Sequence, residues 1–202
     1  MKNYIITAFI LVFALCTVKS ADAQMLPSNG DRTFEITVSP FSSSPVSFSH
    51  LRIRTFNSQN TAMRMRAGLN YLNESQNEDN SNSRLSILLA PGMEWHPIQE
   101  GRLSIYYGVE VPISYVTTRE NVDGVKNVNN DGGEHFGLGL NSLLGFDIHF
   151  LERLYTGVEI SYGLRYRSFL DAELNGNEIE NNGSDISFSN SAISQFRLGF
   201  TF

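Results

Sequence analysis

Apolar and polar residues alternate along almost the whole chain after residue 23. The clearest run is RLSIYYGVEVPISY, in which every second side chain from Leu103 to Tyr115 is apolar or aromatic. The opposite face of this run carries Ser104, Tyr106, Gly108, Glu110, Pro112 and Ser114. A period of two is the pattern of a β-strand, and no later segment has convincing helical periodicity. The sequence therefore predicts an all-β fold.

The same alternation recurs in eight segments, which predicts eight strands. The second segment is irregular, because Val46 and Phe48 are out of phase with Leu51 and Ile53, and we expect a β-bulge there. The apolar faces of the eight predicted strands are Phe34, Ile36, Val38; Leu51, Ile53, Thr55; Met63, Met65, Ala67, Leu69, Tyr71; Leu85, Ile87, Leu89, Met93, Trp95; Leu103 to Tyr115; Phe136, Leu138, Leu140, Leu144, Phe146, Ile148; Val158, Ile160, Tyr162, Leu164, Tyr166; and Phe196, Leu198, Phe200, Phe202.

The connections between these segments alternate in length. Three are predicted to be short turns, with the sequences NSQN, HPIQEG and LER. On the other side SPFSSSP is short, but NESQNEDNSNS and the stretches around ENVDGVKNVNNDGG and LDAELNGNEIENNGSD are long polar loops. Short turns at one end, longer loops at the other and an even strand number are typical of an eight-stranded antiparallel up-and-down transmembrane β-barrel.

A soluble, lipocalin-like barrel would alternate in the same way, with its polar face in water. Residues 24–202 contain a single lysine, Lys126, and the polar faces are instead rich in glycine and serine, with sparse charges. Small residues interleaved with arginine suit the inside of a narrow barrel. Aromatic residues near the ends of the apolar faces suit membrane interfaces; they are Tyr71, Trp95, Tyr115, Phe150, Tyr166 and Phe202. The pattern favours the membrane barrel.

The first 23 residues have the features of a secretory signal peptide: the basic start MKNY, the apolar run IITAFILVFALCTV, and ADA before Gln24. We expect cleavage after Ala23 and a barrel domain over residues 24–202. Cys16 lies inside the apolar run, and Leu15 before it disfavours a lipid-attachment site. Loss of Lys2, Lys19 and Asp22 leaves 13 basic and 20 acidic residues, a net charge of −7. This balance argues against nucleic acid as a partner.

The last residues, SQFRLGFTF, place Phe196, Leu198, Phe200 and Phe202 on one face. This ending resembles the recognition signal that bacterial outer-membrane proteins present to the barrel assembly machinery. The segment GLNSLLGFDIHFLERLYTGVEISYGL is similar to a hairpin common in such barrels. Residues 24–202 as a whole resemble the small eight-stranded outer-membrane β-barrel family of the OmpA transmembrane domain and OmpX. The resemblance implies an outer-membrane location, whereas the family's members serve many functions.

Charged residues also lie on the polar, inward faces of the predicted strands. The predicted lumen network consists of Glu35, Arg52, Arg54, Arg64, Arg66, Glu94, Glu110, Asp147, Glu159, Arg165 and Arg197. One interpretation is a selectivity ring along an ion path, and the other is a salt-bridged plug. An eight-stranded barrel has room only for side chains, which favours the plug.

Catalytic and metal sites are not predicted. The four histidines are scattered: we place His50 and His149 in the lumen, His96 in a turn and His135 near the outer rim. NVNNDG matches half of a calcium-loop pattern, but Leu138 stands where the bidentate acid belongs. We expect no cofactor.

The sequence thus predicts a non-enzymatic outer-membrane barrel with acidic extracellular loops, acting in surface interaction or envelope integrity. The alternatives are a narrow channel or small-solute transporter and, third, a lipid-modifying enzyme. The expected partners are outer-membrane lipid, the assembly machinery and an unidentified extracellular ligand.

Overall fold

The computed structural model describes residues 26–38, 46–77, 80–123, 125–129, 133–191 and 196–202. These residues form a single antiparallel sheet of thirteen strands. The strands are β1 Arg32–Val38, β2 Val46–Ser58, β3 Thr61–Asn77, β4 Asn80–Glu100, β5 Leu103–Glu110, β6 Ile113–Val122, β7 Val125–Val128, β8 His135–Leu151, β9 Leu154–Phe169, β10 Ala172–Leu174, β11 Asn177–Ile179, β12 Ser184–Ser191 and β13 Phe196–Thr201.

The sheet closes on itself as a ring of eight staves, where a stave is one strand, or two strands in line, between the same two neighbours. β5 and β6 form one stave, because both pair with β4 on one side and with β8 on the other. β12 and β13 form another, since both pair with β9, and β13 also pairs with β1. The remaining neighbours are β1–β2, β2–β3, β3–β4 and β8–β9. The predicted eight-stranded antiparallel up-and-down barrel is confirmed.

The break between β5 and β6 falls at Pro112, which has no backbone N–H to donate to a neighbouring strand. The local backbone groups remain paired: Val111 N donates to Pro91 O, and Gly139 N donates to Pro112 O, both at 2.9 Å. The wall is therefore continuous through the break.

Side chains alternate between a buried inner face and an exposed outer face. In β5, Ser104, Tyr106, Gly108 and Glu110 are buried, whereas Tyr107 and Val109 are exposed. The exposed side chains are the apolar ones: Met63 is 56% and Leu144 is 51% exposed. An apolar exterior around a charged interior is the inverse of a soluble barrel, and it fits lipid outside the wall.

Aromatic side chains mark the two limits of the apolar exterior. Trp95 and Tyr107 stack at one limit, with ring centroids 5.5 Å apart, and the exposed Tyr71, Tyr115 and Tyr166 lie at the other. A membrane strand needs roughly 9–11 residues, whereas β3 has 17 and β4 has 21. The barrel wall therefore continues beyond the outer aromatic limit.

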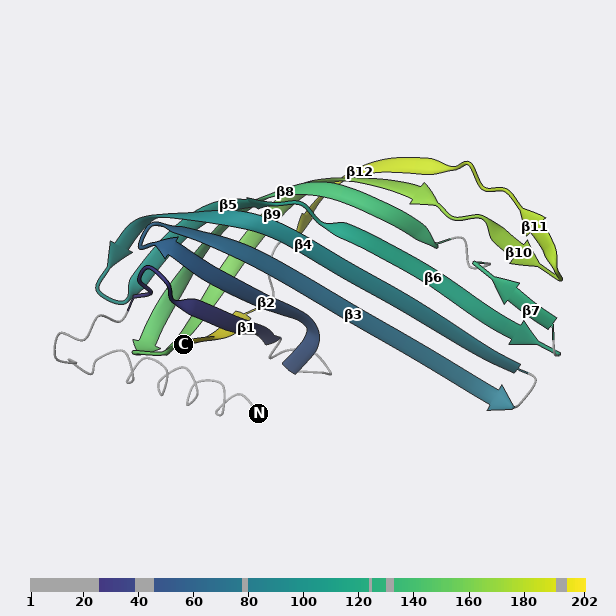
Figure 1. Cartoon of the computed structure of the whole chain (residues 1–202), viewed down its shortest axis with the longest axis horizontal. Helices are drawn as coiled ribbons and strands as arrows, with labels where there is room; N and C mark the ends of the chain where they lie inside the picture. Colours follow the sequence, from purple (N-terminus) through teal and green to yellow (C-terminus); the bar gives the residue numbers. More distant parts are fainter. Residues whose placement is uncertain (1–25, 39–45, 78–79, 124, 130–132, 192–195) are drawn as a thin grey trace, which may run out of the picture.

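The outer connections are more ordered than the sequence predicted. Most of NESQNEDNSNS belongs to β3 and β4, and the two longest loops contain β7, β10 and β11. These three strands lie at the end of the molecule opposite the short turns and the C-terminus (Figure 1). The connections are as long as predicted, and the short strands within them were not predicted because three or four residues are too few for a period of two to stand out.

Two local irregularities bear on the lumen. The β1–β2 register shifts between Ile36, which pairs with Leu51, and Thr37, which pairs with Ser47; this is where a bulge was predicted. The predicted turn HPIQEG was wrong, because β4 continues to Glu100 and only Gly101 and Arg102 connect it to β5. A register shift between Trp95 and Ile98 accommodates Pro97 within the strand.

Within the described ranges, no helix has the length and apolar character that crossing a membrane requires.

Candidate functional site in the barrel lumen

The lumen is filled by five arginines and five carboxylates that form one connected set of ion pairs, named here the lumen network. Each arginine contacts at least one of the carboxylates, and each carboxylate contacts at least two arginines. Because the two kinds of group are equal in number, their formal charges balance. The members are Arg52, Arg54, Arg64, Arg66, Arg197, Glu35, Glu94, Glu110, Asp147 and Glu159.

Arg54 lies at the centre of the network, and its side chain is fully buried. Its Nε is 2.7 Å from Glu35 Oε1, and its Nη1 is 2.8 Å from Asp147 Oδ2 and 3.1 Å from Glu94 Oε2. The guanidinium carbon also lies 5.1 Å from the centre of the Tyr155 ring. The planar fork of arginine allows one side chain to hold three carboxylates from three other strands.

Glu159 connects the two pairs of arginines that the sequence places on neighbouring strands β2 and β3. It accepts two hydrogen bonds from Arg52, at 2.9 and 3.1 Å, and two from Arg64, at 2.9 and 3.2 Å. Arg64 also reaches Glu94 at 2.7 Å and Glu110 at 3.1 Å. Arg66 pairs with Glu110. These acids offset the repulsion among the four like charges.

Two tyrosines extend the network across the lumen. Tyr155 Oη donates to Glu35 Oε1 at 2.8 Å, and Tyr106 Oη donates to Glu159 Oε2 at 2.7 Å. Glycine makes room for both rings, because a Cβ at Gly199 would overlap the Tyr155 ring and one at Gly145 would overlap the Tyr106 hydroxyl. These glycines of the inner face therefore leave the space that the two tyrosine rings occupy.

On the side of the network that faces the short turns lies a second layer of inward side chains, none of them an arginine or a carboxylate. All of its members are at most 8% exposed, and we name this layer the floor. It consists of Thr33, Phe56, Ala62, His96, Ser104, His149, Tyr155 and Thr201. Sequence reasoning did not identify the floor as a unit, although its members continue the inward alternation of the charged residues.

The histidines do not all lie where the sequence placed them. His96 was predicted in a turn, but it lies in β4 with a ring that is 1% exposed, and Nδ1 lies 2.8 Å from Ser104 Oγ. The extra strand residues after Trp95 carry it into the barrel. His149 is also 1% exposed, and its ring lies 4.9 Å from that of Tyr155. His135 is near the outer rim, where Nδ1 donates to Gly133 O at 2.8 Å.

Arg165 does not join the lumen network. It lies on the inward alternation of β9, but its side chain is exposed, and its backbone pairs with Gly139 rather than with the charged part of β8. Six residues separate it from Glu159, which is about 20 Å along a strand. β9 continues beyond the level of the lumen network. Alternation predicts the face on which a residue lies but not its height along the barrel.

Near the outer rim, Arg167 pairs with Asp185 instead. Arg167 Nε donates to Asp185 Oδ1 at 2.9 Å, and Nη2 bonds the second carboxylate oxygen. This hydrogen bonding lowers the pKa of the Asp185 carboxyl. The pair joins β9 to β12 beyond Tyr166.

The residues of the predicted assembly signal lie in the closing strand. Leu198, Phe200 and Phe202 are exposed on the outer face, and the rings of Phe200 and Phe202 stack with centroids 6.4 Å apart. The backbone of Phe196 pairs with Val38 and Val158. Arg32 and Phe202 exchange two backbone hydrogen bonds, at 2.9 and 3.1 Å.

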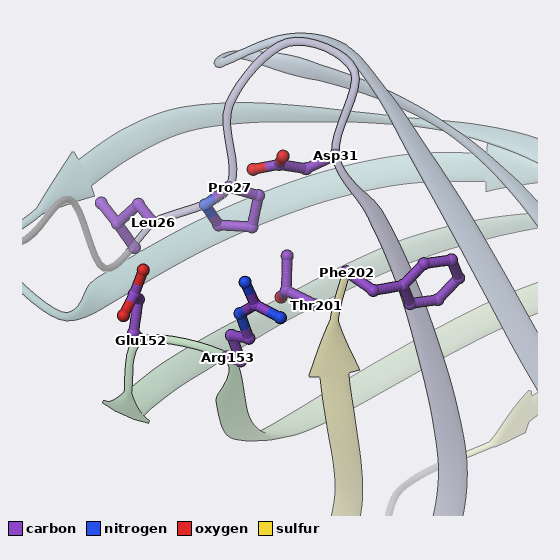
Figure 2. A pocket seen from close by; sticks show the side chains of 7 residues that line it. All are labelled: Leu26, Pro27, Asp31, Glu152, Arg153, Thr201 and Phe202. Carbon is purple, nitrogen blue, oxygen red and sulfur yellow. The ribbon is translucent and has the colours of Figure 1, made fainter.

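A pocket of about 140 Å³ opens beneath the floor. Figure 2 shows it between the N-terminal segment around Pro27, the β8–β9 turn with Glu152 and Arg153, and the end of β13. Thr201 belongs both to the floor and to the lining of this pocket. The full lining is Leu26, Pro27, Asp31, Glu152, Arg153, Thr201 and Phe202.

The chemistry of the lumen is that of mutually neutralised charge. Every carboxylate of the network is held by arginine, which leaves none of these groups poised as a base. No group of three or more histidine, cysteine, aspartate or glutamate side chains that could hold a metal ion occurs in the part of the chain that the structure describes.

Comparison with known proteins finds a matching family model and a similar solved structure. Residues 75–202 match a family model described as "Putative OmpA-OmpF-like porin family". Among solved structures, the fold is similar to that of Ail, the attachment invasion locus protein of Yersinia pestis, with 8% sequence identity and a TM-score of 0.42. The match covers 86% of this chain and 99% of that one. A search of curated proteins finds no match.

Proposed function

The chain belongs to the OmpA-OmpF-like porin family of outer-membrane β-barrels, and from this premise we propose that it is a non-enzymatic barrel with a closed lumen and an interacting outer surface. Its work is surface interaction or envelope integrity, and its ligand binds the acidic extracellular end. The observation that carries the closed lumen is the balanced lumen network, in which Arg54, Arg64, Glu94 and Asp147 are each at most 3% exposed.

A conducting pore needs a hydrated path, and the network fills the cross-section where that path would run. Side chains from β1, β2, β3, β4, β8, β9 and β13 meet there through ion pairs of 2.7 to 3.2 Å. Breaking one partner away leaves a desolvated charge behind, which opposes opening. The closed lumen is therefore the resting state of the barrel.

The outer end supports a binding role because two of its long connections pair with each other to form one surface. Glu173 of β10 pairs with Val128 of β7, and Asn129 Nδ2 donates to Asp171 O at 2.9 Å. Two long connections are thus joined into one platform that continues the wall of β6. Glu173, Glu178 and Glu180 are exposed on it, so a partner with a basic surface is favoured.

Planar-bilayer recording tests the closed lumen. The wild-type protein at neutral pH is expected to show little or no steady conductance. The alternative function, a narrow channel or small-solute transporter, predicts discrete openings whose ion selectivity changes in Arg64→Ala. Reproducible currents of that kind at neutral pH would replace the closed-lumen proposal with the channel.

Binding to the outer surface is tested by replacing residues 172–179, the β10–β11 hairpin, with a short Asn-Gly turn. The barrel is expected to assemble normally, because this hairpin lies outside the closed ring, while capture of surface partners on whole cells falls. Equal capture by both proteins would remove the platform from the proposed function.

The same proposal includes the route to the membrane. Residues 1–23 act as a cleaved signal peptide, residues 24–202 form the barrel domain, and the outward face of β13 is read by the assembly machinery. The exposed Leu198, Phe200 and Phe202 support this, since a recognition signal has to be accessible. Outer-membrane lipid covers the apolar exterior, and the acidic net charge of −6 for the whole sequence disfavours nucleic acid.

A further inference from the structure

The two floor histidines are buried, and their polar atoms are poorly satisfied. His149 has no hydrogen-bond partner at Nδ1 or Nε2, and His96 has none at Nε2. Buried polar atoms are normally paired, so unpaired ones need an explanation. A charged imidazole donates from both nitrogens, whereas the neutral ring has one donor and one acceptor. An added proton on either ring would therefore require a new hydrogen-bond acceptor in the floor.

Both histidines stand beside carboxylates that hold Arg54. His96 Nε2 lies 3.4 Å from Glu94 Oε2, and His149 follows Asp147 on the same inward face of β8. The titratable and charged groups that the surrounding strands direct toward the floor are Glu35 of β1, Arg54 of β2, Glu94 of β4, Tyr106 of β5, Asp147 of β8, Tyr155 of β9 and Arg197 of β13.

Protonation of this pair would disturb the network at its centre. Two added positive charges would end the balance of five arginines and five carboxylates. Imidazolium donors would compete with Arg54 for Glu94 and Asp147, and these are two of the three acids that Arg54 joins. A hydrated lumen accommodates the excess charge better than a dry one, because burial disfavours charged groups.

We propose that protonation of His96 and His149 opens the lumen, so that the protein conducts ions in acid but not at neutral pH. This acid-activated conduction rests on the closed lumen of the proposed function. A ligand shifts an equilibrium toward the state that binds it more tightly. Here the ligand is the proton, and the state that binds it more tightly is the hydrated, open lumen.

The pocket beneath the floor lies next to this layer at the short-turn end of the barrel. Its lining shares Thr201 with the floor, and Thr201 is joined through Arg153 O, at 2.8 Å, to the strand that carries Tyr155. Tyr155 in turn packs on His149. Figure 2 shows Thr201 and Arg153 side by side in this pocket. We therefore take this pocket as the route by which protons reach the floor.

The test records the full mature barrel in planar bilayers while pH is lowered from about 7 to about 5, the range in which histidine titrates. The open fraction should rise by about tenfold per pH unit for each histidine that takes up a proton on opening. His149→Phe keeps the packing on Tyr155, and His96→Gln keeps a hydrogen-bonding group beside Ser104 Oγ. Each single variant should lose about half of the logarithmic slope, and the double variant should stay closed.

His135→Phe is the matched control, because His135 is a buried histidine at the outer rim and should not alter acid opening. Faster migration of unheated samples on a gel confirms that each variant has assembled. If His149→Phe does not assemble, His149→Gln takes its place. Acid opening that persists in the double variant, or its absence from the wild type, would overturn the inference. Conduction by the wild type at neutral pH would instead overturn the closed lumen.

Discussion

At the scale of single residues, the lumen depends on side chains that each serve several partners. Arg64 contacts Glu94, Glu110 and Glu159 and is 3% exposed. Arg64→Ala leaves these buried carboxylates short of positive charge, and loss of one partner from a buried ion pair costs about 3–5 kcal/mol. We expect a lower unfolding midpoint in denaturant while insertion still occurs. The exposed Arg165 is the control, and Arg165→Ala should change stability by less than about 0.5 kcal/mol.

Glycine is the second determinant at this scale. Gly199 lies against Tyr155, so the Cβ of Gly199→Ala would overlap a ring that is 0% exposed and cannot move aside. Overpacking of this kind costs about 1–3 kcal/mol. At Gly133 the nearest atom to an added Cβ is 3.7 Å away, on Arg84. Urea titration should therefore separate a destabilised Gly199→Ala from a nearly unchanged Gly133→Ala, and equal midpoints would contradict the packing described here.

At the scale of the strand, the alternation predicted which face of each element is inside. It placed Arg64 and Glu110 inward because a strand directs successive side chains to opposite faces, and the structure has both buried. It did not predict that Glu159 would meet Arg52, 107 residues away in the chain, because that contact depends on the register and stagger of seven strands. The strands β10 and β11 were missed, since each has only three residues, too few for a period of two to give a signal.

The outward face sets a requirement that differs from that of the lumen. Val109 lies on the exposed face of β5, within the apolar band. Val109→Arg would place a charge in lipid, at about 2–4 kcal/mol near the bilayer midplane, and it should reduce folding into lipid vesicles. Asn73→Arg, beyond Tyr71 on the exposed outer part of β3, should fold normally. Equal folding yields would mean that lipid does not cover this part of β5.

The two ends of the strands should lie on opposite sides of the membrane. Cys16 is the only cysteine, and it lies in the expected signal peptide, so single cysteines report without background. An impermeant thiol reagent on intact cells should label Asn182→Cys at the outer end and spare Asn60→Cys in the β2–β3 turn. Both asparagines are exposed, and permeabilised cells should show labelling at both positions. Labelling of Asn60→Cys in intact cells would invert the orientation.

At the scale of the whole molecule, stability comes from closure. Each stave of the ring pairs with two neighbours, and β13 joins β1 through six registered residue pairs. Closure leaves no strand edge in the apolar band to face lipid along that seam. The charged interior and the closed wall depend on one another, because the network is dry only when the ring is complete.

A closed barrel should stay folded in detergent under conditions that unfold an open sheet. The mature protein, beginning at Gln24, is expected in the outer-membrane fraction and should migrate faster on a gel when unheated than when boiled, because the intact barrel remains compact in detergent. Disrupting the seam tests the cause: Phe34→Asp in β1, paired with Phe200 across the seam, puts a carboxylate on the lipid-facing side and should abolish the fast form. Arg32→Gln, exposed at the end of β1, should retain it. A wild-type protein that is found in the soluble periplasm, or that shows one mobility with and without heating, would refute the outer-membrane barrel itself.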